Sequence, residues 1–409
     1  MTKLDVDFVR KQFPSFKFPE VSGNGFFENA GGSFMSYQVM ERLNRYHSQR
    51  RVQPYWIFNS SKLAGNEMDE ARERMASLLN IPYNTLHFGA STSQNTYILA
   101  NAFRDLNLET KKVVIVTDQD HEANTGVWRR LERYGYFIKE WKVRKDSGSL
   151  IIEDLIKILD ENVCLLTFPH CSNIIGEINP VKEICSLAKN VGAFTCVDGV
   201  SYAPHGIPLI KDFRPDIYLF SSYKTFGPHL GIMYVSSDLS QVLESQCHYF
   251  NRSYNNKRFT PAGPDHAQIA ALGGVTDYYE AFAKHHFDEK SLNQETIDKI
   301  NQFITQHEHR LLEPLLDFLD QKNSLRVIGS TKTINRVPTV AIKTEKSNIE
   351  LAKKLNDLDV LVGTGDFYAV RLLEALNIDT VEGVMRISFV HYTSKNDIDK
   401  LVKALDSVI

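Results

Sequence analysis

The sequence lacks the residue patterns that mark several large protein classes. Its five cysteines are scattered without a CxxC pair, so we expect no disulfide framework, no structural zinc and no other metal site. Positive charge is not in surplus, because the formal net charge is −3 at pH 7 and no basic run occurs. We therefore expect neither nucleic acid nor an anionic membrane as a partner.

Long hydrophobic runs are missing too. No apolar stretch approaches the length of a transmembrane helix, and the first residues lack the apolar centre of a secretory signal peptide. Internal repeats and low-complexity tracts are also absent. What is present is the composition of an ordinary globular protein, with 43% hydrophobic residues to form a core. We expect a cytoplasmic location.

The length of the chain predicts more than one domain. At 409 residues it is too long for a single compact core. We predict an N-terminal segment over residues 1–25 that packs on the body, a large domain over 26–288, and a small C-terminal α+β domain over 289–409. A helix is expected to run through the boundary near residues 285–295.

Short apolar strands alternate with helical stretches through most of the predicted large domain. Strands are expected at residues 85–88, 112–117, 137–141, 163–168, 193–197, 216–220 and 231–235. Continuous apolar strands between helices predict an α/β fold, with a mostly parallel seven-stranded sheet covered by helices on both faces. In such sheets a ligand binds beyond the carboxyl ends of the strands.

Two ionisable residues stand at such strand ends. Lys224 follows the strand at 216–220 and precedes a glycine turn, and Asp198 follows the strand at 193–197. A buried Lys–Asp ion pair is one explanation of this pattern. The other is pyridoxal phosphate (PLP) chemistry, in which the lysine forms a Schiff base and the carboxylate keeps the pyridine nitrogen protonated.

Three more strand ends carry polar residues that fit the second explanation. Thr92 and Ser93 are either helix N-cap residues or, with the helix N-terminus, an anion site. His121 is either a capping or surface histidine or a ring that stacks on an aromatic cofactor. Asn173 stands in a plain turn or donates a hydrogen bond to a phenolate oxygen. Five such strand ends together favour a PLP site over five unrelated coincidences.

Longer motifs support this interpretation. From Phe27-Glu-Asn-Ala-Gly-Gly32 to the last helix, the sequence resembles the class V (fold-type I) PLP-dependent enzymes, close to cysteine desulfurases and selenocysteine lyases. The resemblance implies PLP as cofactor, an amino-acid substrate, and a homodimer with shared active sites. It also implies the catalytic groups: Lys224 as the Schiff-base lysine, Asp198 at the pyridine nitrogen, His121 stacked on the ring, and Arg386 clamping the substrate carboxylate.

The same resemblance implies which residues bind each ligand. The cofactor-binding set is Thr92, Ser93, His121, Asn173, Asp198, Ser201, Ser221, Tyr223, Lys224 and Thr260. Within this set, Thr260 is expected to reach the phosphate of the neighbouring subunit. The substrate-binding set is Asn29, Ala30, Gly31, Tyr368 and Arg386.

The sequence departs from the desulfurase pattern where those enzymes bear a catalytic cysteine. The equivalent stretch, residues 361–369, contains Tyr368 but no cysteine, and a persulfide cannot form there. Tyr223 replaces a usual histidine, Ser201 replaces a usual glutamine, and Gly363 stands where the family often has an arginine. These differences preserve the cofactor expectation and remove persulfide sulfur transfer. The chain most resembles a cysteine desulfurase-like branch that lacks the catalytic cysteine.

The reaction class stays open at this point. We favour a PLP-dependent C–S or C–Se lyase that works by β-elimination through Lys224 without a persulfide cysteine. An aminotransferase, an epimerase and a non-catalytic PLP-binding dimer are the alternatives. Tyr223 and Tyr368 are either packing aromatics or proton donors near the leaving group.

Overall fold

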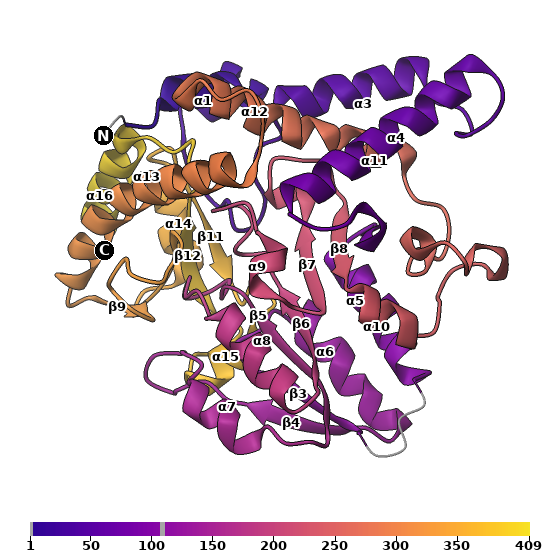
Figure 1. Ribbon diagram of the computed structural model, residues 1–409. Coiled ribbons are helices and arrows are strands. Elements are labelled where there is room, and N and C mark those ends of the chain that lie inside the picture. Colours follow the sequence, from indigo (N-terminus) through magenta and orange to yellow (C-terminus); the bar gives the residue numbers. More distant parts are fainter. Residues whose placement is uncertain (1–2, 107–110) are drawn as a thin grey trace.

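The computed structural model describes residues 3–106 and 111–409 (Figure 1). The described strands form two sheets. The larger has seven strands in the order β2-β8-β7-β6-β5-β3-β4. Their bounds are β2 (Leu86–Gly89), β3 (Val113–Thr117), β4 (Phe137–Trp141), β5 (Val163–Pro169), β6 (Phe194–Asp198), β7 (Ile217–Ser221) and β8 (Gly231–Val235).

Strand β8 is the exception in an otherwise parallel sheet. It runs antiparallel to both of its neighbours, β7 and β2, while the remaining pairs are parallel. The predicted strands at 137–141 and 231–235 have the expected bounds. Those at 112–117 and 163–168 differ by one residue at one end, and the other three are shifted by one residue toward the C-terminus. The predicted α/β class and the mostly parallel seven-stranded sheet are confirmed.

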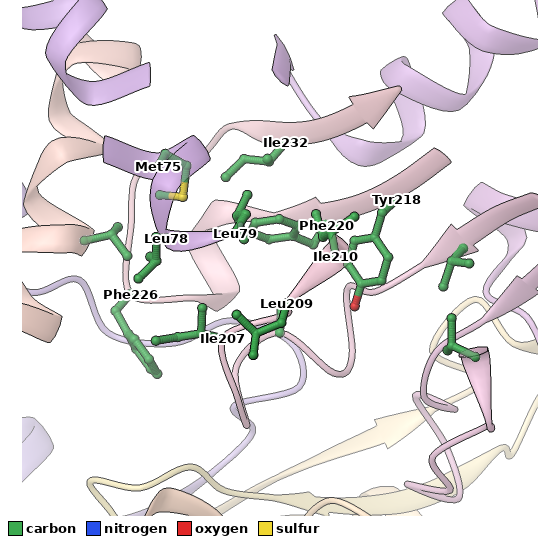
Figure 2. Packing of buried hydrophobic residues seen from close by; sticks show 14 of the residues in the cluster. Met75, Leu78, Leu79, Ile207, Leu209, Ile210, Tyr218, Phe220, Phe226 and Ile232 are labelled. Carbon is green, nitrogen blue, oxygen red and sulfur yellow. The ribbon is translucent and has the colours of Figure 1, made fainter. Parts of the chain in front are cut away.

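Helices cover both faces of this sheet, which explains why its strands are continuously apolar. Alternate residues of β7 point to opposite faces: Leu219 belongs to a core cluster with α5 and α6, whereas Phe220 belongs to another with α4, α8 and α12. Figure 2 shows part of the second cluster, where Phe220 and Ile232 lie beside Leu79 at the end of α4. The helices around the sheet are α3 (Tyr37–Gln49), α4 (Asn59–Leu78), α5 (Thr92–Arg104), α6 (Glu122–Arg129), α7 (Ile152–Ile158), α8 (Val181–Asn190), α9 (Ile210–Phe213), α10 (Ser237–Val242), α11 (His266–Ala271) and α12 (Gly273–Phe287).

The second sheet is built mainly from the C-terminal part of the chain. Its order is β1-β11-β12-β10-β9, with β1 parallel to β11 and the other pairs antiparallel. Its elements are β1 (Gly25–Phe27), β9 (Leu325–Ile328), β10 (Thr339–Thr344), β11 (Val360–Gly365) and β12 (Val384–Ser388), with α13 (Gln294–Asp320), α14 (Asn348–Asn356), α15 (Val370–Ala375) and α16 (Lys395–Val408). Figure 1 shows α13 and α16 on the side of this sheet that faces away from β7 and β8.

Two features of this region were not expected from the sequence. Strand β1 joins the C-terminal sheet, so the turn that follows it lies beside β12. The helix predicted through residues 285–295 is wrong, because α12 ends at Phe287 and α13 begins at Gln294. Asp288 has a left-handed backbone with φ of 57°, which stops α12, and the Asn293 side chain caps α13. The domain boundaries at 25/26 and 288/289 stay a prediction.

The N-terminal residues pack beside the turn that carries Lys224. Phe13, between α1 (Val6–Lys11) and α2 (Pro19–Ser22), is buried, with its ring edge-on to Phe226 and to Tyr392 at centroid distances of 5.5 and 5.0 Å. The beginning of the chain therefore supports both the lysine turn and the end of β12. None of the helices in the described part of the chain is long and apolar enough to cross a bilayer.

Candidate active site

A cavity opens at the carboxyl ends of β3, β5, β6 and β7, the edge where the sequence predicted a ligand. Its empty volume is about 630 Å³, which includes space open to solvent. The predicted site residues that line it are Thr92, Ser93, His121, Asn173, Asp198, Ser201, Ser221, Tyr223 and Lys224. The sheet therefore brings together side chains that are far apart in the sequence.

Lys224 ends a short 3-10 turn, Ser222–Lys224, that follows β7. Its side chain is 9% exposed, and the described residues give its Nζ neither a hydrogen bond nor an ion pair. Burial lowers the pKa of Lys224 to about 8, helped by the positive charge of Arg386 and opposed by Asp198. A lysine with this pKa is partly neutral near physiological pH, so its amine can act as a nucleophile.

Asp198 is the last residue of β6 and pairs in register with Leu219 of β7. Its Oδ1 accepts a hydrogen bond from Val200 N at 2.8 Å, and among the described ion pairs none involves this carboxylate. Burial raises the pKa of Asp198 to about 6, although the Val200 hydrogen bond and the charge of Lys224 oppose the shift. A buried carboxylate without a close cation can bind a protonated ring nitrogen.

His121 caps the N-terminus of α6, so the capping role considered from the sequence is confirmed. Its Nδ1 accepts a hydrogen bond from Ala123 N at 3.0 Å, which leaves the ring proton on Nε2. Burial, with the charges of Lys224 and Arg386, lowers the pKa of His121 to about 4. The imidazole is therefore neutral at pH 7 and lines the cavity, where it can also stack on a planar ligand.

The N-terminus of α5 forms one end of the cavity. Ser91 is its N-cap and accepts a hydrogen bond from Gln94 N at 3.1 Å, while Thr92 and Ser93 stand in the first turn. Thr92 Oγ1 lies 2.8 Å from Ser221 Oγ. Hydroxyl groups beside free backbone N–H groups at a helix N-terminus can bind a phosphate.

A glycine lets this loop lie against the sheet. A Cβ atom at Gly231, the first residue of β8, would lie 2.4 Å from the backbone carbon of Ser91. Any other residue at position 231 would push the N-terminal turn of α5 away from β8. The position of the hydroxyl groups at this end of the cavity therefore depends on Gly231.

The loop after β11 packs against two residues of the cavity wall, Asn173 and His121. Phe367 and Tyr368 both have left-handed backbones, with φ of 50° and 57°, a strained arrangement for bulky side chains. Asn173 Nδ2 donates to Phe367 O at 3.0 Å, and Glu122 N donates to Tyr368 O at 2.8 Å. The Tyr368 ring is 70% exposed and its centroid lies 5.3 Å from that of His121.

The lining residues fit PLP. Three buried polar groups lack some of their possible hydrogen-bond or ion-pair partners among the described residues. They are Lys224 Nζ, the Asp198 carboxylate and Asn173 Oδ1. A heterocycle that carries a carbonyl carbon, a basic ring nitrogen and a phosphate offers a partner for the amine, the carboxylate and the α5 hydroxyl groups. The cavity thus combines a reactive amine with groups that can bind this cofactor.

Arg386, on β12, lies outside the residues that line the cavity but close behind them. Its side chain is 3% exposed, and its Nη2 donates to Glu28 Oε1 at 2.7 Å. Nη1 donates to Asn173 O at 3.2 Å, and Cζ lies 3.7 Å from the Phe367 ring centroid. Burial lowers the pKa of Arg386, and the Glu28 carboxylate opposes this shift. The predicted carboxylate clamp is therefore paired with an acidic residue of its own chain.

Several predicted residues lie away from the cavity lining. The Asn29 amide donates to Ser388 O and accepts from the Tyr392 hydroxyl, and Ala30 N donates to Ser388 Oγ at 2.9 Å. These hydrogen bonds hold the turn after β1 onto the end of β12, and Gly31 N donates to Glu28 O within the turn. Thr260 lies in a separate hollow, described below. The substrate and cofactor roles of these residues stay predictions.

Seven lining residues are not among the predicted site residues, and they include Gln119, Cys171 and His229. Gln119 hydrogen-bonds Gly148 O, Glu177 and Asn179, so it orders the cavity wall. The His229 ring is stacked on Tyr223, with centroids 4.7 Å apart and an interplanar angle of 3°. Cys171 is a buried thiol whose pKa is raised by burial. Nothing local in the sequence signals that these side chains reach the cavity.

The family model described as "Aminotransferase class-V" matches residues 25–401. The chain belongs to this family. Class V aminotransferases are PLP-dependent enzymes, so the predicted cofactor and the prediction that the chain is an enzyme are confirmed. The cavity described above lies within the matched residues.

Known class V relatives match this chain from end to end. The aminotransferase-like protein FGM3 of Gibberella zeae is 28% identical and covers 100% of this chain and 99% of its own. A cysteine desulfurase of Pectobacterium carotovorum is 25% identical over 98% of both chains. Among solved structures, the apo cysteine desulfurase of Thermococcus onnurineus has a TM-score of 0.84 at 20% identity, over 100% of this chain and 99% of its own. The last likeness shows the shared fold.

Proposed function

We propose that this class V enzyme acts on an amino acid through Lys224, as a C–S or C–Se lyase that works by β-elimination. The observation that carries the proposal is the pair formed by Lys224 and Asp198, two buried ionisable groups that line one cavity and lack close partners among the described residues. PLP bound there would supply an electron sink for the carbanion that forms when a substrate loses its α-proton.

Each catalytic group has a distinct task in this proposal. Lys224 would hold PLP covalently, and its amine would be the base that accepts the α-proton of the substrate. Asp198 would keep the ring nitrogen of PLP protonated, and the neutral His121 ring would pack against the cofactor. Arg386 binds the substrate carboxylate, which fixes the orientation of the bond that breaks. Ser201, Tyr223 and Asn173 complete the wall around the cofactor.

We infer that the chain works without a persulfide cysteine, which favours elimination over sulfur relay. Residues 248–409 contain no cysteine, and the loop where desulfurases bear theirs has Tyr368 instead. Cys171 lines the cavity, but burial raises its pKa and its thiol donates toward Ser172 O, so it is a poor nucleophile. Sulfur lost from the substrate would therefore leave as sulfide instead of being passed to a protein thiol.

An aminotransferase is the second candidate. Its support is the relative from Gibberella zeae, whose name describes an aminotransferase-like protein. The two reactions differ in what they need: β-elimination of cysteine consumes water and releases pyruvate, ammonia and sulfide, whereas transamination passes the amino group to a keto acid. An epimerase would return the amino acid with inverted configuration. A non-catalytic PLP-binding dimer would release no product.

A product screen separates these reactions. The purified, PLP-loaded protein is incubated with cysteine, selenocysteine, cysteine sulfinate, alanine and aromatic amino acids, with and without a keto acid. We expect sulfide or selenide together with pyruvate in the absence of the keto acid. Alanine as the product from cysteine would contradict the β-elimination step. Turnover that requires a keto acid would establish the aminotransferase, and no turnover of any substrate would support the non-catalytic dimer.

We also propose that the protein is a homodimer in which Thr260 reaches the partner's cofactor. Thr260 lines a hollow with an empty volume of about 1480 Å³ between the segment before α4 and the segment after α10. Three exposed aromatic residues line it, Tyr55, Phe250 and Tyr254, and the exposed Trp56, Ile57, Phe58 and Tyr249 stand in the same two segments of the chain. Such a patch on one face is typical of a protein interface.

Analytical ultracentrifugation should give a dimer, and Trp56→Glu should shift it toward the monomer. A wild-type monomer with bound PLP would refute this part of the proposal.

The division into domains belongs to the same proposal. The interval between Phe287 and Gln294 carries no helix, which suits a boundary near residue 288. Limited proteolysis should cut first in this interval if the two parts fold separately. Cleavage confined to other loops would place the boundary elsewhere.

A further inference from the structure

The structure pairs the predicted carboxylate clamp with a carboxylate of the chain itself. Glu28 directly follows β1 and forms a bridge to Ser388 of β12. This backbone contact places the Glu28 side chain over Arg386, two residues earlier on β12, where Oε1 accepts the Nη2 hydrogen bond at 2.7 Å. The two residues are 358 positions apart in the sequence.

Two glycines leave room for the Glu28 carboxylate. A Cβ atom at Gly363, which pairs with Arg386 across β11 and β12, would lie 2.2 Å from Glu28 Oε2. A Cβ atom at Gly31 would lie 2.7 Å from Oε1. Larger residues at either position would expel the carboxylate from this place, so the local sequence accommodates the Glu28–Arg386 pair.

Each member of the Glu28–Arg386 pair has one polar atom that makes no hydrogen bond among the described residues. Glu28 Oε2 and Arg386 Nε are buried atoms that have no hydrogen-bond partner among the described residues. Arginine and a carboxylate bind most strongly through two parallel hydrogen bonds, and Glu28 uses only one. The Glu28 side chain is also 28% exposed, so it can turn toward solvent, whereas Arg386 is held by Asn173 O and the Phe367 ring.

We propose that Glu28 is a specificity-determining residue: it occupies Arg386 in the absence of substrate, and the substrate carboxylate displaces it. This inference rests on the proposed function, in which Arg386 binds that carboxylate. Because Glu28 competes with every incoming carboxylate, a ligand held at Arg386 alone binds weakly. An amino acid is held at two points, by its carboxylate at Arg386 and by its amine at the cofactor, and so overcomes the competition. Glu28 thus selects amino acids over simple carboxylic acids.

The test measures the binding of propionate, a carboxylate that has no amine, to the PLP-loaded protein by titration calorimetry. Glu28→Gln keeps the shape of the side chain and removes its charge. We expect it to bind propionate at least about tenfold more tightly than the wild type, because the hydrogen bonds of a charged pair no longer have to be replaced. Arg386→Gln should abolish binding in the presence of either residue at position 28. Glu20→Gln, an exposed change in α2, should leave the affinity unchanged.

Two results would overturn the inference. One is an affinity of Glu28→Gln equal to or weaker than that of the wild type. The other is a gain in propionate affinity that persists in the Glu28→Gln/Arg386→Gln double variant. Circular dichroism and thermal unfolding monitor folding, and Glu28→Asp, which keeps the charge on a shorter side chain, should give an intermediate affinity.

The binding assay is independent of turnover, so the two proposals fail separately. If Glu28→Gln binds propionate more tightly but no amino acid is converted, the displacement holds and the proposed reaction is wrong. If amino acids are converted and propionate affinity does not depend on Glu28, the reaction holds and the displacement is wrong.

Discussion

Thr92 Oγ1 lies 2.8 Å from Ser221 Oγ, although the two residues are 129 positions apart. The contact joins the first turn of α5 to the end of β7 and sets two hydroxyl groups side by side at the edge of the cavity. Both side chains are buried. A pair of buried hydroxyl groups at a helix N-terminus is well placed to donate hydrogen bonds to a phosphate.

This contact predicts the effect of removing either hydroxyl. Thr92→Val and Ser221→Ala should each weaken PLP binding by about tenfold, the loss expected for one hydrogen bond to a charged group. Fluorescence titration of the cofactor-free protein with PLP measures the change. Ser186→Ala, an exposed position in α8, is the control. An unchanged affinity for PLP in both cavity variants would show that the phosphate does not bind at this end of the cavity.

Lys224 should carry the cofactor covalently. Borohydride reduction of the PLP-loaded wild type should make the adduct permanent, and mass spectrometry of peptides should find it on Lys224. Lys224→Ala should give no reduced adduct, whereas Lys189→Ala, at a surface site in α8, should behave as the wild type. An adduct on another lysine would contradict the assignment.

The lowered pKa of Lys224 also predicts a pH-dependent stability of the cofactor-free protein. Its pKa is about 8 in the folded chain and 10.5 for the ordinary side chain, so between these values the unfolded chain binds more protons. Stability therefore rises with pH through this window, and below pH 8 the buried ammonium is destabilising. Lys224→Met should increase the free energy of unfolding at pH 7 by on the order of 2–3 kcal/mol, a gain that fades above pH 10. Urea unfolding at pH 7 and above pH 10 measures this gain. If the difference in the free energy of unfolding between the variant and the wild type did not change with pH, the buried ammonium would not be its cause.

Gly231 predicts a link between packing and cofactor binding. Gly231→Ala should lower the free energy of unfolding by about 1–3 kcal/mol and weaken PLP binding, because the new Cβ collides with the Ser91 backbone. At Gly206 the nearest atom to an added Cβ is 3.5 Å away, an ordinary contact, so Gly206→Ala is the matched control. Thermal unfolding and PLP titration of both variants give the result. Equal behaviour of the two would refute the role of Gly231.

Much of the large sheet could be predicted from the sequence because its strands are buried on both faces. Runs such as Val113–Thr117 are apolar at nearly every position, and helices separate most of them. The strand ends then indicated where Asp198, Lys224 and His121 would meet, because parallel strands present their carboxyl ends at one edge.

Other features were beyond the sequence, for reasons that lie in long-range pairing. Strand β1 has only three residues, and its pairing with Val360–Val362 depends on a partner more than 300 positions away. The expected helix through residues 285–295 failed because Asp288 adopts a left-handed backbone that its residue type allows but does not require. The contacts of Glu28 with Arg386 and of His229 with Tyr223 needed the assembled fold.

The sequence by itself determined the sheet, the family and the chemical types of the groups at the strand ends, because hydrophobic period and residue chemistry are local properties. Only the tertiary structure decided that Arg386 is already paired and that Lys224 Nζ has no hydrogen-bond or ion-pair partner among the described residues. Those two facts depend on which side chains meet across the fold, and the same contacts, with burial, set the charge and the reactivity of each group.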